Sequence, residues 1–310
     1  NSLEKKKKVN KPNDSLLKLA TLIDLKRFKK KHSFFVGIDS DGTIFNSMKL
    51  KHESFYLKPL IRIFNLEKLS TEVKEIWYHV NIFSSNRGIN RFKALVKTFE
   101  YLSKFDGVRI PDLNGLKKWI KISSELSDES LSEFINFKNL VDKNTDEEKV
   151  LIWSREINNS IKMSKIDIAP FEGAKKALRY LYSHADIIVI SNTPLASLNR
   201  DWEKSGLKKY ISLIGGQETG TKVQMLNTAT KNKYEKKNIL VIGDSLSDYR
   251  SAKVNNSYFF PIIPGCEAKS WEQFLNTGLN LFFNGNFKKN YEKKLIERFK
   301  SQFEISPTWS

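Results

Sequence analysis

The sequence has 310 residues, of which 40% are hydrophobic and 28% are charged. This balance is typical of a globular protein, and it excludes a chain that is disordered throughout. The single cysteine, Cys266, cannot form an internal disulfide. No run of about 18 apolar residues is present, which excludes a membrane-spanning helix. We therefore expect a protein of the reducing cytoplasm.

The formal net charge is +18, and much of it lies at the start of the sequence. Residues 1–31 contain eleven basic and three acidic side chains. A positive field attracts phosphorylated solutes and nucleic acids alike. Few aromatic side chains that could stack on bases lie among these lysines. We therefore favour a solvated basic arm over a nucleic-acid-binding segment.

Five short apolar segments are predicted to be buried parallel strands, because they are rich in β-branched or aromatic residues and end abruptly in polar ones. They comprise residues 34–38, 187–190, 211–214, 239–242 and 258–262. Helical patterns separate or follow the later segments, at residues 173–183, 196–205, 223–234, 247–254, 270–276 and 289–303. The alternation predicts an α/β fold with a Rossmannoid, doubly wound parallel sheet.

Residues 46–167 interrupt this alternation with helical patterns and no convincing strand. One helix face is formed by apolar residues at helical spacing, namely Phe92, Leu95, Val96, Phe99 and Leu102. Ser130 and Glu133 have the spacing of a capping box, and residues 147–163 form a further helical pattern. A segment of this size can bury a core of its own, which predicts an all-helical cap domain inserted after the first strand. The predicted division is a basic arm at 1–31, an α/β core at 32–45 and 168–310, and a cap at 46–167.

Polar residues follow three of the predicted strands. Asp-Ser-Asp-Gly-Thr stands at 39–43, Ser-Asn-Thr at 191–193, and Gly-Asp-Ser-Leu-Ser-Asp at 243–248. Ligands bind at the carboxyl ends of parallel strands. If the first and fourth strands are neighbours, the carboxylates of these segments converge and repel one another unless a cation lies between them. Ligand sets made only of oxygen atoms favour Mg²⁺.

Together these segments resemble the haloacid dehalogenase superfamily of phosphohydrolases. Residues 39–43 are similar to its Asp-x-Asp-Gly-Thr motif, and Ser191 stands at its second motif. Lys222 is assigned to the third motif, and Gly-Asp with Asp248 is similar to the fourth. Residues 170–173 resemble the return of the chain to the core after a cap inserted between the first two motifs.

The resemblance implies that Asp39 is a nucleophile that forms an aspartyl-phosphate, and that Asp41 acts first as acid and then as base. Mg²⁺ would be held by Asp39, the backbone carbonyl of Asp41 and Asp244, with Asp248 in support. The residues implied to bind phosphate are Gly42, Thr43, Ser191, Asn192 and Lys222. The presence of Asp41 favours phosphate esters over carbon–halogen or carbon–phosphorus bonds.

Local structure alone offers a second interpretation of some of these residues. Asp39 and Asp41 could close a strand in a turn. Ser191 could cap the next helix, a role that is compatible with phosphate binding. Asp248 could equally cap a helix that begins near Ser247.

The predicted cap contains an unusual segment at residues 86–92, in which two arginines and two asparagines surround Gly88 just before the amphipathic helix. Arg87 or Arg91, with Asn90 beside them, could bind a second anionic group of a substrate through a planar guanidinium. A polar turn with exposed arginines is the alternative.

The sequence therefore predicts a Mg²⁺-dependent phosphatase for a small phosphorylated metabolite, with a cap that closes over the site. One alternative is a sugar phosphomutase of the β-phosphoglucomutase kind, which would use the same aspartyl-phosphate. The other, suggested by the charge, is a nucleic-acid-end phosphatase or a nucleic-acid-binding protein.

Overall fold

The computed structural model describes residues 21–138, 145–164, 166–287 and 289–303. Its five strands form one sheet in the order β3-β2-β1-β4-β5, and every neighbouring pair is parallel. The strands are β1 (Phe34–Ile38), β2 (Ala185–Ile190), β3 (Leu213–Gly215), β4 (Ile239–Gly243) and β5 (Tyr258–Pro261). The predicted parallel α/β sheet is confirmed, although β3 begins two residues later than expected.

Helices cover both faces of the sheet because successive strand residues point to opposite sides. Val36 and Ile38 belong to one hydrophobic cluster, whereas Phe35, beside them in β1, belongs to the other. The first cluster includes residues of α9 (Glu172–Leu181), α10 (Leu195–Lys204), α13 (Glu267–Gln273), the π-helical η7 (Phe274–Gly278) and α14 (Leu279–Phe283). The second includes residues of α1 (Leu22–Arg27), α11 (Lys222–Thr230), α12 (Leu246–Val254) and α15 (Lys289–Ser301). Short 3₁₀ turns lie in the connections at η4 (Lys208–Tyr210), η5 (Gln217–Thr219) and η6 (Lys236–Asn238).

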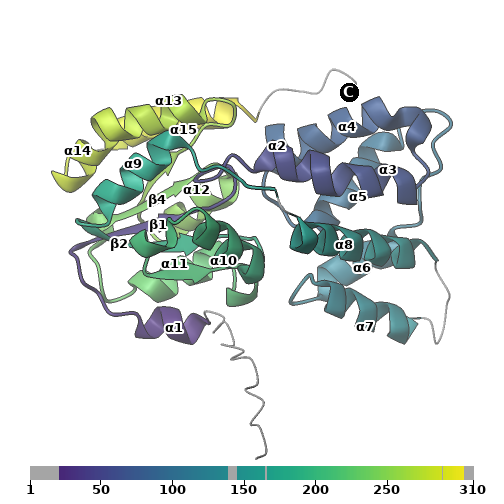
Figure 1. Cartoon of the computed structure of the whole chain (residues 1–310), viewed down its shortest axis with the longest axis horizontal. Helices are drawn as coiled ribbons and strands as arrows, with labels where there is room; N and C mark the ends of the chain where they lie inside the picture. Colours follow the sequence, from purple (N-terminus) through teal and green to yellow (C-terminus); the bar gives the residue numbers. More distant parts are fainter. Residues whose placement is uncertain (1–20, 139–144, 165, 288, 304–310) are drawn as a thin grey trace, which may run out of the picture.

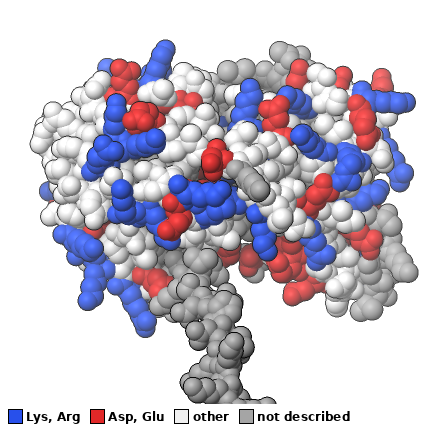
Figure 2. All heavy atoms as spheres, in the orientation of Figure 1, with Lys and Arg blue, Asp and Glu red and all other residues white. Residues whose placement is uncertain are grey.

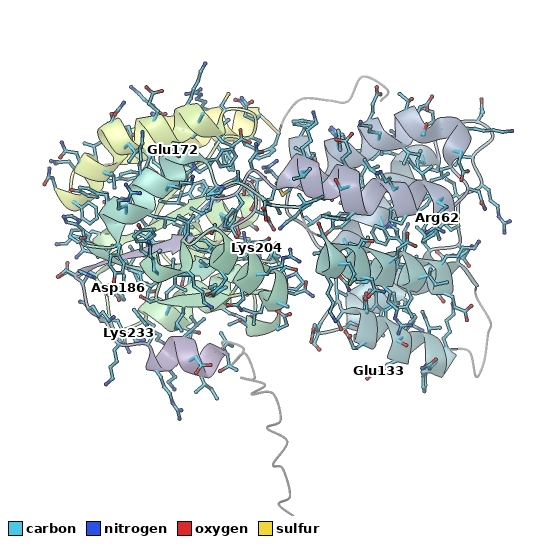
Figure 3. The ribbon with its side chains drawn as sticks, in the orientation of Figure 1. Arg62, Glu133, Glu172, Asp186, Lys204 and Lys233 are labelled. Atoms are coloured by element: carbon cyan, nitrogen blue, oxygen red, sulfur yellow. The ribbon has the colours of Figure 1, made fainter. Side chains whose placement is uncertain are left out.

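The described part of the predicted basic arm is folded against the core. Leu25 of α1 is fully buried in the second hydrophobic cluster. The Lys233 ammonium donates hydrogen bonds to the carbonyls of Leu25, Lys26 and Phe28, so it satisfies the carboxyl end of α1 (Figure 3). Leu25 thus anchors α1 to the core, while the basic side chains of residues 26–31 are exposed. The basic arm stays a prediction, and residues 1–20 lie outside the described residues.

The chain between β1 and α9 is largely helical and lies to one side of the sheet (Figure 1). Its helices are α2 (Met48–Lys51), the π-helical η1 (His52–Leu57), α3 (Lys58–Ile63), the 3₁₀ turn η2 (Glu67–Leu69), α4 (Ser70–Tyr78), the π-helical η3 (His79–Phe83), α5 (Arg91–Leu102), α6 (Asn114–Ile122), α7 (Asp128–Lys138) and α8 (Thr145–Met163). They enclose a third hydrophobic cluster, separate from the two on the sheet, which includes Trp77, Trp119 and Trp153. The described residues of this stretch contain no strand. The separate cluster supports the predicted cap, whose boundaries stay a prediction.

Two helices of the cap differ in how closely they match their sequence patterns. Helix α5 buries the whole apolar face predicted for it. The predicted capping box at Ser130 is wrong, because α7 begins at Asp128 and the backbone N–H of Ser130 donates to the hydroxyl of Ser127 at 3.2 Å. The residue that caps α7 is thus Ser127, three residues earlier. None of the described helices combines the length and hydrophobicity of a transmembrane span.

A half-buried histidine lies among the cap aromatics. The ring of His52 lies 4.7 Å from that of Tyr56, centroid to centroid, and its Nδ1 accepts a hydrogen bond from Trp77 Nε1 at 3.0 Å. Burial, together with the positive charge of Arg87, lowers the pKa of His52 to about 3. His52 is therefore neutral in the folded protein at pH values where a free histidine is protonated.

This difference predicts a pH-dependent stability. A histidine in the unfolded chain takes up a proton near pH 6.5, whereas folded His52 does so near pH 3. Its contribution to the free energy of unfolding is thus complete above pH 6.5 and is lost as the pH falls toward 3. Between pH 7 and pH 5 we expect the wild type to lose about 1–2 kcal/mol more than His52→Gln in urea unfolding. Parallel pH profiles for the two proteins would contradict this.

Candidate active site

The sheet topology brings the first and fourth sequence motifs together. Strands β1 and β4 are neighbours, and the backbone N–H of Asp39 donates to the carbonyl of Ile242 at 3.0 Å. Asp39 follows β1 and Asp244 follows β4, so both carboxylates stand at the same edge of the sheet. Their convergence follows from parallel strand pairing.

Two buried tryptophans of the core hold the loop that follows β1. Trp202 of α10 donates from Nε1 to the Ser40 hydroxyl at 3.0 Å, and Trp271 of α13 donates from Nε1 to the Thr43 carbonyl at 2.9 Å. The loop turns at Gly42, whose φ is +76°, a left-handed conformation that favours glycine. The side chains of this motif are therefore presented by a fixed backbone.

Three buried carboxylates form a cluster at this edge. Asp39, Asp244 and Asp248 each offer an oxygen, and these three atoms lie within 4.8 Å of one another. Burial raises the pKa of Asp39 to about 6 and that of Asp248 to about 6, and it also raises the pKa of Asp244. The oxygen Oδ1 of Asp39 is buried and has no hydrogen-bond partner among the described residues. An unpartnered buried carboxylate oxygen in such a cluster fits a position for a cation.

Lys222 supplies a positive charge to the cluster from the core side. It is the first residue of α11, whose N-cap is Thr221, and its ammonium lies 2.9 Å from Asp39 Oδ2 and 2.7 Å from Asp248 Oδ1. Burial acts to lower the pKa of Lys222, but the two carboxylates outweigh it and the pKa is raised. The ammonium therefore stays protonated and partly neutralises the cluster.

Asp248 also has a local structural role. It is the third residue of α12 and forms a capping box with Ser245, the N-cap, whose backbone N–H and hydroxyl both donate to Asp248 Oδ2. The helix thus begins one residue earlier than predicted, and its N-cap is Ser245. Asp248 contributes to the helix and to the carboxylate cluster at once.

The side chain of Asp41 points away from this cluster, toward the first helix of the cap. Its carboxylate accepts hydrogen bonds from Lys51 Nζ at 2.6 Å, Ser47 Oγ at 2.5 Å and Thr193 Oγ1 at 2.7 Å. Burial acts to raise the pKa of Asp41, but the charge and hydrogen bond of Lys51 outweigh it and lower the pKa to about 2. Lys51 also contacts Asp201 of α10 at 3.2 Å. In this conformation Asp41 is an ionised carboxylate bound to a cap lysine.

The residues predicted to bind phosphate lie around the same edge. The Thr43 hydroxyl donates to Asp244 Oδ1 at 3.2 Å, and the Ser191 hydroxyl accepts from the backbone N–H of Thr193 at 3.3 Å. The side-chain amide of Asn192 donates to the carbonyl of Gly88 in the cap at 3.2 Å. Thr43, Ser191 and Asn192 thus stand at the ends of β1 and β2, and Asn192 also joins core and cap.

The structure separates the three predicted specificity residues of the cap. Arg87 reaches the carboxylate cluster and contacts Asp244. Asn90 is the N-cap of α5 and donates to the Leu126 carbonyl, and Arg91 contacts Ser154 and Asn158 within the cap. Asn90 and Arg91 are therefore engaged in cap structure, and neither Arg87 nor Arg91 is the exposed arginine of the alternative polar turn.

Sequence reasoning missed the partners of Asp41 on the cap side and on α10. Lys51 and Asp201 lie far apart in the sequence and have no motif spacing, so only the tertiary structure brings them together. Thr193 carries a signal, because it follows a predicted strand together with Ser191. Ser47 carries none beyond its closeness to the first motif.

Gly42 provides a test of how tightly this edge is packed. A methyl group at position 42 would overlap the Asp244 carboxylate and lie against the Arg87 guanidinium, and it would also strain the backbone at φ +76°. We expect Gly42→Ala to lower the free energy of unfolding by roughly 1–3 kcal/mol beyond the backbone strain alone, measured by chemical denaturation.

Gly107→Ala is the matched control, because Gly107 has φ +75° and no atom within 4 Å of the added methyl group. It should show the backbone cost of about 1–2 kcal/mol and no more. Equal losses for the two variants would mean that position 42 is not constrained by the carboxylate and the guanidinium.

The sequence matches a known protein family over much of its length. The family model of the haloacid dehalogenase-like hydrolases matches residues 89–260, which is more than half of the chain. This range begins in the cap and ends in β5, so it includes the second to fourth motifs and leaves out residues 39–43. A search of curated proteins found no match.

Solved structures show similarity at low identity. A haloacid dehalogenase-like hydrolase from Xanthomonas campestris is 12% identical, with 86% of this chain and 97% of that chain covered and a TM-score of 0.44. A protein described as a predicted phosphoglycolate phosphatase from Haemophilus somnus is 14% identical, with 79% and 97% covered and a TM-score of 0.44. A HAD-hydrolase from Bacillus subtilis bound to magnesium is 15% identical, with 74% and 86% covered and a TM-score of 0.40.

Because these TM-scores are below 0.5, only the match to the family model shows the family. The extent of that match, which spans more than half of the sequence, shows that the chain belongs to the haloacid dehalogenase-like hydrolases.

Proposed function

We propose that this hydrolase is a Mg²⁺-dependent phosphatase that acts on a small phosphorylated metabolite through an aspartyl-phosphate on Asp39. The observation that carries the proposal is the state of the Asp39 carboxylate. One oxygen contacts Lys222 at 2.9 Å, and the other is buried with no partner among the described residues. Such an oxygen, next to Asp244 and Asp248, is suited to a metal ion or to an electrophile.

The carboxylate cluster fits a magnesium ion. Asp39, Asp244 and Asp248 offer oxygen ligands only, close enough together to share one ion. The backbone carbonyl of Asp41 is the further ligand implied by the family resemblance. When bound, Mg²⁺ would offset the repulsion between a carboxylate nucleophile and a phosphate dianion.

Asp39, paired with the Lys222 ammonium, has the properties of a nucleophile. With a pKa of about 6, its carboxylate is mostly ionised at neutral pH and remains basic enough to attack. An oxygen of Asp39 forms a bond to phosphorus while the ester bond from phosphorus to the leaving oxygen breaks. Lys222, already 2.9 Å from Asp39, would hold a phosphoryl oxygen as charge develops there.

Asp41 would carry the proton in both steps. It would protonate the leaving oxygen of the substrate, and its carboxylate would then take a proton from the water that hydrolyses the aspartyl-phosphate. In the present conformation Lys51 lowers the pKa of Asp41 to about 2, so the carboxylate is in the form of the base. Before it can donate a proton, Asp41 must lose its contact with Lys51.

The position of the cap over the carboxylates favours a small substrate. Arg87 and Gly88 of the cap contact Asp244 and Asn192 at the strand ends, and the reacting carboxylates are buried. A site covered in this way excludes bulk water and large substrates. Arg87 is the predicted specificity residue that lies against the carboxylates, so it is our choice for a second anionic group of the substrate.

The surface charge gives less support to a nucleic-acid substrate. On the face shown in Figure 2, lysine and arginine side chains are spread over both parts of the molecule, with aspartate and glutamate among them. Nucleic-acid-binding surfaces gather basic side chains along a groove or stripe. We therefore keep the small metabolite as the proposed substrate.

Replacing the nucleophile provides the central test. We expect Asp39→Asn to reduce phosphate release from p-nitrophenyl phosphate in MgCl₂ at least about a thousandfold, because an amide cannot form the acyl-phosphate. Removal of divalent cations with EDTA should have a similar effect on the wild type. Asp167→Asn is the control, since the Asp167 side chain is 86% exposed and pairs with Lys204 at the surface.

The two enzyme classes are separated by their products. A phosphatase releases inorganic phosphate from a panel of phosphorylated metabolites, whereas a phosphomutase returns the phosphoryl group to the sugar as an isomer. Wild-type activity in Asp39→Asn would overturn the aspartyl-phosphate. Detection of an isomeric sugar phosphate by ³¹P NMR would contradict the phosphatase activity. It would still be consistent with Asp39 as the nucleophile, because a phosphomutase uses the same aspartyl-phosphate.

A further inference from the structure

We propose that Arg87 competes with the divalent cation for Asp244, so that metal binding and docking of the cap loop on the core exclude each other. The cap loop is defined here as residues 84–90, between η3 and α5. This inference rests on the proposed metal site at Asp39, Asp244 and Asp248, and it concerns regulation of that site.

The guanidinium of Arg87 lies directly on the carboxylate of Asp244. Its Nε donates to Asp244 Oδ2 at 2.7 Å, and its Nη2 lies 2.5 Å from the same oxygen. Its Nη1 donates to the carbonyl of Ile82 at 3.0 Å, which fixes the direction of the side chain. Arg87 is 3% exposed and Asp244 is 2% exposed, so the ion pair is buried. Water does not screen such a pair as it would at the surface.

Both oxygens of Asp244 are occupied by protein groups in this conformation. Oδ2 receives the two nitrogens of Arg87, and Oδ1 accepts a hydrogen bond from the Thr43 hydroxyl at 3.2 Å. Asp39, by contrast, has an oxygen without a partner among the described residues. A cation that enters the cluster can therefore bind Asp39 Oδ1 directly. To bind Asp244 it must first displace Arg87 or the Thr43 hydroxyl.

The charge of the cluster leads to the same conclusion. Three carboxylates face the ammonium of Lys222 and the guanidinium of Arg87, which leaves one net negative charge. Without Arg87 the net charge is two negative, which a divalent cation neutralises. Two cations of this size and charge on one buried carboxylate repel each other strongly.

The backbone at Gly42 leaves room for the Arg87–Asp244 ion pair. At Gly42 a side chain would overlap the Asp244 carboxylate and lie against the Arg87 guanidinium, so the missing side chain leaves room for both. The cap loop is also held by the hydrogen bond from Asn192 to the Gly88 carbonyl. Displacement of Arg87 therefore leaves the cap loop held to the core by the Asn192–Gly88 hydrogen bond.

The test measures Mg²⁺ binding to the full chain by calorimetry, without substrate. We expect Arg87→Gln to bind Mg²⁺ about tenfold more tightly than the wild type or more, because the competing cation is absent. Arg87→Lys should lie between them, since lysine retains the charge but loses the two-nitrogen contact. Arg62→Gln is the control: Arg62 is a cap arginine in an exposed ion pair with Glu156, far from the core (Figure 3), and its removal should leave the affinity unchanged.

Thermal unfolding gives a second readout that also reports whether each variant folds. Without metal, Arg87→Gln should have a lower Tm than the wild type, because Asp244 loses its counter-charge. Addition of MgCl₂ should then raise the Tm of Arg87→Gln more than that of the wild type, as tighter binding requires. In the wild type, Mg²⁺ should increase the hydrogen exchange of the cap loop amides.

An equal or weaker Mg²⁺ affinity in folded Arg87→Gln would overturn the competition and leave the metal site intact. Absence of Mg²⁺ binding in the wild type and in both Arg87 variants would overturn the metal site, and the competition with it. The proposed phosphatase chemistry is tested separately through Asp39→Asn. Tighter Mg²⁺ binding by a folded Arg87→Gln would support the competition for Asp244, whatever the substrate is.

Discussion

The burial of several carboxylates at one edge of a parallel sheet is the constraint on which the rest of the structure depends. Strands β1 and β4 are neighbours, so Asp39 and Asp244 must come together where the strands end. Burial penalises each charge, and no carboxylate remains there without a counter-charge nearby. Lys222 supplies one from the core, to Asp39 and Asp248. The cap supplies the others, through Lys51 to Asp41 and through Arg87 to Asp244.

Polar contacts near the site join the cap to the core. Its helices have a hydrophobic cluster of their own, separate from those on the sheet. Where the chain leaves the core, Lys51 contacts Asp201, and near where it returns, Arg200 donates to the carbonyl of Ile161 at 2.7 Å. Such an interface resembles one between domains that move relative to each other, rather than the continuous core of a single domain. Opening the cap would expose charged groups that are paired here, and a metal ion and a substrate are the species that could pair with them instead.

The strands and the motifs after them could be predicted from the sequence because both depend on local patterns. A short β-branched run identifies a buried strand, and parallel pairing then places the polar residues at the strand ends along one edge. The partners of Asp41 could not be predicted in the same way. Lys51 is one of 53 basic residues, and nothing local distinguishes it before the cap is docked. Asn90 and Arg91 show the opposite limit, because they cap and brace helices of the cap, and the sequence pattern did not indicate these contacts.

The two cap cations hold Asp41 and Asp244 in paired states that differ from those the proposed reaction would need. Asp41 is held as a carboxylate by Lys51, although the proposed first chemical step would need it protonated. Asp244 is held by Arg87, although the proposed metal needs one of its oxygens. Both contacts belong to the same docked position of the cap, so a single displacement of the cap would release both groups. Entry of the metal would then replace the positive charge that the cap withdraws from Asp244, and the freed cap cations would be available to the anionic substrate.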